Sequence, residues 1–334
     1  MRKINLKKLT FVLVFMNVIF FIGINYFNYF KPQIEAEASE ERPDDETQAK
    51  NVYLNIMTTD KMVYNMCSQI VNGEHNVMMM FDDAEDENNF KINNDTLNNV
   101  SKMDLFMYTG KGNETWLDKF IEKLKKGKVG IIDLSRGTKT INNSKPIIGD
   151  NKEIKYNGYY WLSPDEYKIS LYNVKNAIQE RDVKNREIYE KNYENILSEI
   201  AEKEKELQKE SEFFKGKKVI LIGDKLEYLM QYLKIDYVKI PQDITDEEFK
   251  KKIDEICNNG KKSNENLTDD DKSKENDNKV IFVLDEKQES DIIKKELSSL
   301  HNKVLNINVD KNKDYVDYLN GVSSSIIKLK EQNK

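Results

Sequence analysis

Residues 104–137 read DLFMYTGKGNETWLDKFIEKLKKGKVGIIDLSRG, and this stretch decides the fold class. It contains two short apolar runs, at residues 105–108 and 129–133, separated by a segment with helical spacing. Within that segment, residues 114–124, apolar side chains recur at i, i+3, i+4 and i+7, as on one face of a helix. Strands that alternate with helices predict a mostly parallel sheet with helices covering both of its faces.

The same alternation continues on both sides of this stretch and restarts at Lys217. We expect further strands at residues 52–56, 77–81, 219–222, 237–240, 280–284 and 304–309. We expect further helices at residues 61–71, 226–233, 246–257, 290–300 and 315–330. Thr245 and Glu248 form a capping box at the start of one of them. The pattern predicts an α/β protein with two lobes, each a mostly parallel sheet flanked by helices.

A long helical stretch separates the two sets of strands. Ser163, followed by Pro164 and then by Glu166, is a strong helix start. Residues 183–212 carry an apolar stripe that lasts too few heptads for a coiled coil, which favours one helix joining the lobes. The predicted organisation is an N-terminal lobe at 51–182, an inter-lobe helix at 183–215, and a C-terminal lobe at 216–334 with a disordered insert at 259–279.

The first 50 residues predict attachment to a membrane. Residues 1–8 carry four positive side chains, and residues 9–30 form an apolar run long enough to cross a bilayer as a helix. We therefore interpret residues 1–30 as a signal anchor of a single-pass cell-membrane protein whose bulk is extracytoplasmic. Cleavage at the small-residue site 36–38 is the alternative. Residues 31–50 are acidic and nearly free of large apolar side chains, so we expect a flexible stalk.

Composition excludes several classes of function. A net charge of −6 argues against a nucleic-acid partner. The two cysteines lie far apart, and Cys67 falls on an apolar helix face, where we expect it to be buried. The two histidines, His75 and His301, fall in predicted turns, where we expect them to be exposed. Without a Ser/His/Asp or Cys/His set, we expect no enzyme.

Several segments, in order, resemble the zinc/manganese (cluster A-I) solute-binding proteins of ABC importers. The segment 104–137 is similar to the family's "ADLF-Y-G-GLE-WLDK" and "VVDLSKG" stretches. Residues 161–164, WLSP, resemble its "H-x-W-L-D-P" motif. NIMTTDKMVYNM at 55–66, the helix at 184–207 and FFKGKKVILIGDKLEYLMQYLKI at 213–235 are similar to its first strand and helix, its inter-lobe helix and the start of its second lobe. The resemblance implies an ABC permease and an ATPase as partners, and a monomer.

The resemblance also implies one Zn²⁺ or Mn²⁺ between the lobes, held by histidines and acidic residues. The family's ligand positions fall here on Asn88, Tyr159, Gly223 or Asp224, and Asp285 or Asn308. None of these is a histidine, and an amide or a protonated phenol is a poor zinc ligand. We therefore expect no cofactor and no high-affinity metal, and at most a weakly held Ca²⁺ or Mg²⁺. We expect the acidic run at 82–87 to be a solvated acidic loop, and the alternative is that it attracts cations from solution to the neighbouring ligand position.

Two functions remain open from the sequence. The first is an extracytoplasmic solute-binding component of a metal importer whose metal binding is lost or altered. Its cleft then holds a hard cation or an organic ligand beside the aromatic residues 159–161. The alternative is a non-transport adhesin or scaffold on the cell surface that retains the fold.

Overall fold

The computed structural model describes residues 52–333, with gaps inside this range. The gaps are residues 83–86, 88, 113, 125–126, 150–151, 242–243, 259–279, 289–292, 294, 296, 298–302 and 312. The predicted signal anchor at 1–30, the stalk at 31–50, the insert at 259–279 and most of the helix predicted at 290–300 therefore lie outside the described residues. So do Asn88 and His301. Within the described part of the chain, no helix is long and apolar enough to cross a membrane.

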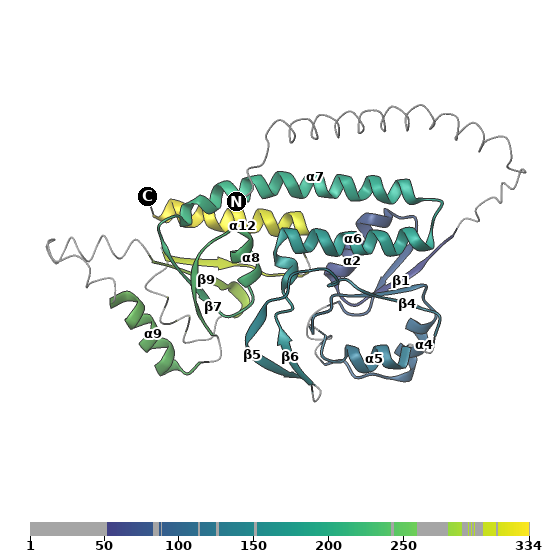
Figure 1. Ribbon diagram of the computed structural model, residues 1–334, viewed down its shortest axis with the longest axis horizontal. Helices are drawn as coiled ribbons and strands as arrows, with labels where there is room; N and C mark the ends of the chain where they lie inside the picture. Colours follow the sequence, from purple (N-terminus) through teal and green to yellow (C-terminus); the bar gives the residue numbers. More distant parts are fainter. Residues whose placement is uncertain are drawn as a thin grey trace, which may run out of the picture. The chain divides into compact units, whose positions relative to one another are not determined.

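Two four-stranded parallel sheets form the centre of the molecule, as the alternation of strands and helices predicts (Figure 1). The first has the order β2-β1-β3-β4, from the strands Asn55–Thr58 (β1), Asn76–Met79 (β2), Leu105–Tyr108 (β3) and Gly130–Asp133 (β4). The second has the order β10-β9-β7-β8, from Lys218–Ile222 (β7), Tyr237–Ile240 (β8), Val280–Asp285 (β9) and Val304–Ile307 (β10). Every strand pair within these two sheets is parallel, so the predicted fold class is confirmed.

Helices flank both sheets. Those of the first half are α2 (Lys61–Val71), α4 (Asn94–Ser101) and α5 (Leu117–Leu124). Those of the second half are α8 (Glu227–Tyr232), α9 (Asp246–Asn258) and α12 (Tyr315–Gln332). Short 3-10 turns occur at Tyr160–Leu162 (η1), Glu212–Phe214 (η2) and Glu286–Gln288 (η4). Cys67 lies on the buried face of α2, as predicted.

The long helix of the prediction is α7, Arg186–Ser211, which is preceded by a separate helix α6, Pro164–Arg181. Figure 1 shows α7 running along α6 and α12, and it also packs against α2. Its apolar stripe (Tyr189, Ile200 and Leu207) is buried in this interface. One helix thus contacts helices from both halves of the chain. The domain bounds that we predict from the sequence stay a prediction.

The two predicted helix caps have different outcomes. Thr245 and Glu248 form the expected capping box, with reciprocal backbone-to-side-chain bonds of 3.1 and 3.3 Å. Ser163 is the N-cap of α6, but its hydroxyl makes no capping bond in the described part of that helix. The Glu166 carboxylate, three residues after this N-cap, makes a contact outside the helix start: it accepts a hydrogen bond of 2.7 Å from the backbone N–H of Lys139.

An antiparallel hairpin between β4 and α6 was not predicted. Its strands are Asn142–Gly149 (β5) and Lys152–Tyr156 (β6), a sequence with few of the apolar alternations that mark a strand. Contacts with the second half of the chain hold its base. The Ile141 backbone donates to the Tyr228 hydroxyl (3.0 Å), and the Ser144 hydroxyl donates to Asp224 (2.6 Å).

His75 lies in the turn before β2, as predicted, but it is buried, so its predicted exposure is wrong. The residue is only 5% exposed. Its Nδ1 accepts a hydrogen bond from the Leu54 backbone (3.4 Å), and its Nε2 lies 2.8 Å from the Tyr189 hydroxyl, which donates to Asp182 (2.6 Å). The neutral ring therefore carries its proton on Nε2. Burial lowers the pKa of His75, although Asp182 opposes this shift.

We expect acidification to destabilise the protein through His75. Because the folded-state pKa is depressed, the contribution of His75 is complete above about pH 6.5, the unfolded-state value. This contribution to the free energy of unfolding is lost at up to about 1.4 kcal/mol per pH unit as the pH falls from about 6.5 towards the folded-state pKa. Urea unfolding between about pH 7.5 and about pH 5 measures this slope. The variant H75Q should be less stable at neutral pH but should lose less on acidification, and an equal slope would contradict the assignment.

Candidate functional site

A cavity of about 280 Å³ lies where loops from both sheets meet. Most of its walls come from residues that follow the carboxyl ends of parallel strands, the edge at which open α/β sheets bind ligands. The first half of the chain contributes Asp60, Lys61, Phe81, Asp82, Glu87, Tyr159 and Trp161. The second half contributes Lys225, Lys287, Val309, Asp310 and Lys311. No histidine occurs among the wall residues that the structure describes.

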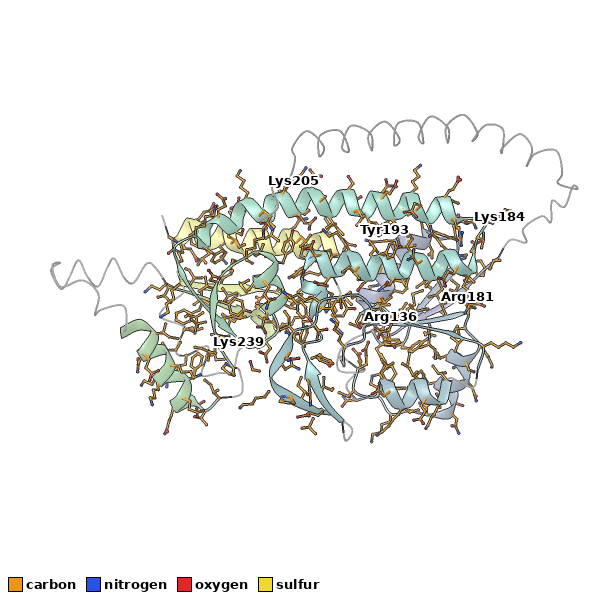
Figure 2. The ribbon with its side chains drawn as sticks, viewed as in Figure 1. Arg136, Arg181, Lys184, Tyr193, Lys205 and Lys239 are labelled. Atoms are coloured by element: carbon orange, nitrogen blue, oxygen red, sulfur yellow. The ribbon has the colours of Figure 1, made fainter. Side chains whose placement is uncertain are left out.

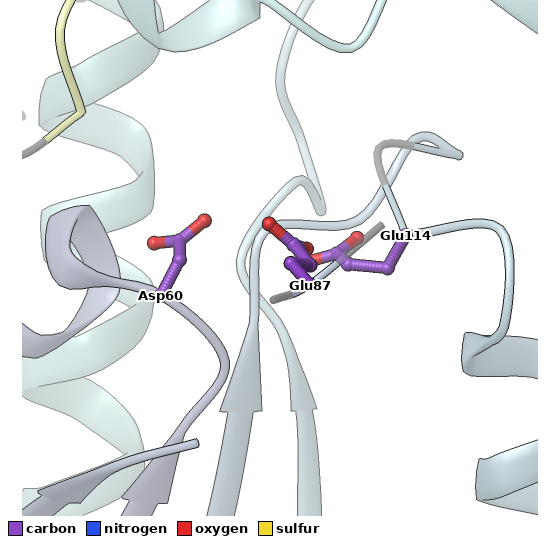
Figure 3. A group of neighbouring side chains, drawn as sticks. All are labelled: Asp60, Glu87 and Glu114. Carbon is purple, nitrogen blue, oxygen red and sulfur yellow. The ribbon is translucent and has the colours of Figure 1, made fainter. Parts of the chain in front are cut away.

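Three buried carboxylates, Asp60, Glu87 and Glu114, lie close together (Figure 3), and the first two line this cavity. Each offers an oxygen within 4.8 Å of the others. Asp60 is the N-cap of α2 and accepts from the Val63 backbone at 3.0 Å. Glu114 is fixed by the backbone N–H of Thr109 at 2.9 Å and that of Gly110 at 3.1 Å. Two of the three acids are therefore oriented by the turns that follow β1 and β3.

Lys311 extends from the loop after β10 into this acidic cluster. Its Nζ donates to Asp60 Oδ2 at 2.9 Å and lies 3.8 Å from Glu87 Oε2, too far for a strong hydrogen bond. The other oxygen of Glu87, Oε1, is buried and has no hydrogen-bond partner among the described residues. Glu87 is only 7% exposed, so the prediction of a solvated acidic loop is wrong at this residue.

Burial, together with the neighbouring charges, shifts the pKa values of the cluster in opposite directions. Burial raises the pKa of Glu114 to about 8, with a further rise from Glu87, while Lys311 lowers it. Burial also raises the pKa of Glu87. For Asp60, burial acts upwards, but Lys311 and the Val63 N–H outweigh it and lower the pKa. Burial acts downwards on Lys311, yet Asp60, Glu87 and Glu114 raise its pKa, so this ammonium group stays charged.

A second lysine, Lys225, also lines the cavity. Its Nζ lies 2.5 Å from Asp285 Oδ2 and 4.9 Å from the centre of the Tyr159 ring. Asp285 also accepts from the Val309 backbone at 3.3 Å, and its side chain is 1% exposed. Two residues selected from the sequence, Tyr159 and Asp285, thus meet at one ammonium group.

Three other selected residues, Gly223, Asp224 and Asn308, do not line the cavity. Asp224 binds the Lys239 ammonium group at 2.8 Å and the Ser144 hydroxyl at 2.6 Å, and Figure 2 labels Lys239 on β8. Gly223 has a φ of +78°, a left-handed conformation that favours glycine, and offers no side-chain donor. Asn308 lines a different cavity, between β10 and α12.

Sequence reasoning missed the residues that dominate the cleft. Asp60, Lys225, Asp310 and Lys311 lie in loops after predicted strands, and Glu114 begins the segment with helical spacing that follows one. The rule that ligands bind at the carboxyl ends of parallel strands could have selected the loops. It could not have selected which side chains turn inwards.

The donor set does not fit a high-affinity zinc centre. Zinc sites in proteins use imidazole or thiolate donors in a tetrahedron, whereas this cavity offers carboxylates, a phenol and ammonium groups. Lys225 and Lys311 place positive charge where a metal cation would have to enter, which opposes its binding.

Two four-stranded parallel sheets, one long helix packed on both halves and a cavity between their loops define a two-lobed α/β protein. The profile of the family described as "Zinc-uptake complex component A periplasmic" matches residues 56–327, so the chain belongs to this family. Among curated proteins, the chain is similar to the metal ABC transporter substrate-binding lipoprotein ScbA of Streptococcus cristatus, 22% identical over 192 residues. That match covers 56% of this chain and 60% of the relative.

Other matches agree. The high-affinity zinc uptake system protein ZnuA of Bacillus subtilis is 22% identical over 163 residues, which cover 47% of this chain and 51% of that protein. The chain thus spans between half and two thirds of the curated relatives it matches. The metal-dependent lipoprotein YcdH of Bacillus subtilis superposes with a TM-score of 0.63 at 18% identity, over 82% of this chain and 98% of that one. At such identity, the structural match shows the fold alone.

A charge-removal experiment tests the Lys225–Asp285 pair. K225M leaves the Asp285 carboxylate buried without its cation, so we expect a loss of about 3–5 kcal/mol in the free energy of unfolding. The double variant K225M/D285N removes both charges and should recover part of that loss. As a matched control, K203M at the more exposed Lys203–Glu206 pair should have little effect. Equal losses for K225M and K203M would contradict the assignment.

Proposed function

We propose that this protein is an extracytoplasmic solute-binding component of the metal ABC importer type, with an altered cleft that binds neither Zn²⁺ nor Mn²⁺ tightly. Family membership supports the first half of the proposal. The observation that carries the second half is the pair of ammonium groups, Lys225 and Lys311, seated on carboxylates within the cleft. These two side chains neutralise acidic groups that would otherwise attract a divalent cation.

The location and partners of the protein follow from the same proposal. Residues 9–30 anchor the chain in the cell membrane as a single pass, and the described residues lie outside the cytoplasm. An ABC permease and an ATPase are the partners if transport is retained, and the protein acts as a monomer. It carries out binding, with no catalytic step and no cofactor.

A surface adhesin or scaffold is the second candidate. One protein of the same fold is the laminin-binding adhesin Lmb of Streptococcus agalactiae, with a TM-score of 0.60 and 16% identity over 84% of this chain and all of that one. The hairpin gives this candidate a physical basis here, because Ile147, Ile148 and Tyr156 are exposed on it. Apolar side chains grouped on a protruding element are typical of interaction surfaces.

Metal titration of the full-length protein, purified in mild detergent, tests the main proposal. We expect no stoichiometric Zn²⁺ or Mn²⁺ binding below about 1 μM by calorimetry, because the cleft lacks imidazole donors and holds two ammonium groups. Submicromolar binding that is lost in D285N would restore ordinary metal import. Binding of purified laminin that is lost when Ile147 and Ile148 are changed to Ser would favour the adhesin.

A further inference from the structure

We propose that Asp60, Glu87 and Glu114 form a site for one hard divalent cation, and that Lys311 fills this site from within as a tethered competing cation. The inference deepens the proposed function, and rests on it, because it states why the cleft resists metal. The ligand class is a cation that prefers oxygen donors, such as Mn²⁺ or Ca²⁺.

The geometry of the three acids is that of a cation site. Their oxygens lie within 4.8 Å of one another, so a single ion can reach all three. They come from three separate places in the chain: the N-cap of α2, the segment after β2, and the turn before α5. Backbone N–H groups orient Glu114, and α2 orients Asp60, so two of the three acids are held in place without an ion.

A single ammonium group does not satisfy this cluster. The Lys311 Nζ bonds to Asp60 but lies 3.8 Å from Glu87. The Glu87 Oε1, in a side chain more than nine-tenths buried, has no partner among the described residues. An unpaired buried carboxylate oxygen is costly, and it indicates coordination capacity that the lysine leaves unused. This orphan oxygen is the observation that separates a cation site from an ordinary ion pair.

The chemistry of the donors selects the cation. All three side chains offer carboxylate oxygen, and the same cavity also contains Asp82 and Asp310. Mn²⁺ and Ca²⁺ accept such oxygen sets and complete their coordination with water, whereas zinc prefers nitrogen and sulfur. The Lys311 side chain as a whole is 22% exposed, so it lies at the boundary between the acidic cluster and solvent.

The decisive experiment compares K311M with the wild type, both as full-length protein in detergent, titrated separately with Mn²⁺ and Ca²⁺. Methionine keeps the length of the side chain and removes its charge. We expect K311M to bind one ion at least roughly 30-fold more tightly than the wild type, because close charge pairs are coupled this strongly. K311R keeps the positive charge and should behave as the wild type. K313M, which removes a lysine two positions away, is the matched control and should also behave as the wild type.

A second substitution locates the ion. Adding E87Q to K311M should weaken binding at least tenfold if Glu87 is a ligand. The proposal is overturned if folded K311M, checked by circular dichroism, binds no more tightly than the wild type, or if E87Q leaves the gain unchanged. Tight Zn²⁺ binding by the wild type would instead refute the proposed function. The two failures are therefore distinguishable.

Discussion

The ion pair between Lys311 and Asp60 is the contact on which the cleft depends. Asp60 serves two elements at once, because Oδ1 caps α2 at 3.0 Å while Oδ2 accepts from Lys311 at 2.9 Å and from the Thr109 hydroxyl at 3.0 Å. The two charged residues are 251 positions apart in the sequence, so one contact joins the start of α2 to the loop after β10. A buried carboxylate requires a partner, and here the partner comes from the other half of the chain. The acidic cluster, the helix start and the loop are consequently interdependent.

The sequence was most informative where local pattern and tertiary environment agree. The strands Leu105–Tyr108 and Tyr237–Ile240 have their predicted bounds, because each is a short apolar or alternating run between polar turns. The hairpin strand Asn142–Gly149 escaped prediction, because Asn, Lys and Pro are depleted in strands and its side chains are largely exposed. Bonds from residues 141 and 144 to the second half of the chain hold it in place. The strand propensity of a segment does not reflect such long-range hydrogen bonds.

The site was less predictable than the fold, and the reason is side-chain direction. A motif locates a position along the backbone, and it located Tyr159 and Asp285 close to the cleft. The same motifs selected Asp224, but its carboxylate pairs with Lys239 outside the cleft. The next residue, Lys225, lines the cleft instead. Lys311 had no local signal at all, since a lysine in a polar loop is normally solvated. Only the packing of two distant halves shows that its charge is buried in carboxylates.

The hairpin β5–β6 has a consequence for how fast the cleft can rearrange. The base of the hairpin is hydrogen-bonded to Asp224 and Tyr228, and α7 packs along both halves at another place. Two separate sets of contacts therefore join the halves. Hinged closure of lobes typically takes microseconds to milliseconds, whereas exposed side chains change rotamer in picoseconds to nanoseconds. These two sets of contacts restrain hinged closure, so the faster motion in the cleft is that of side chains such as Lys225 and Lys311. The rearrangement of these two ion pairs, rather than a hinge, sets the shortest time scale on which the cleft changes.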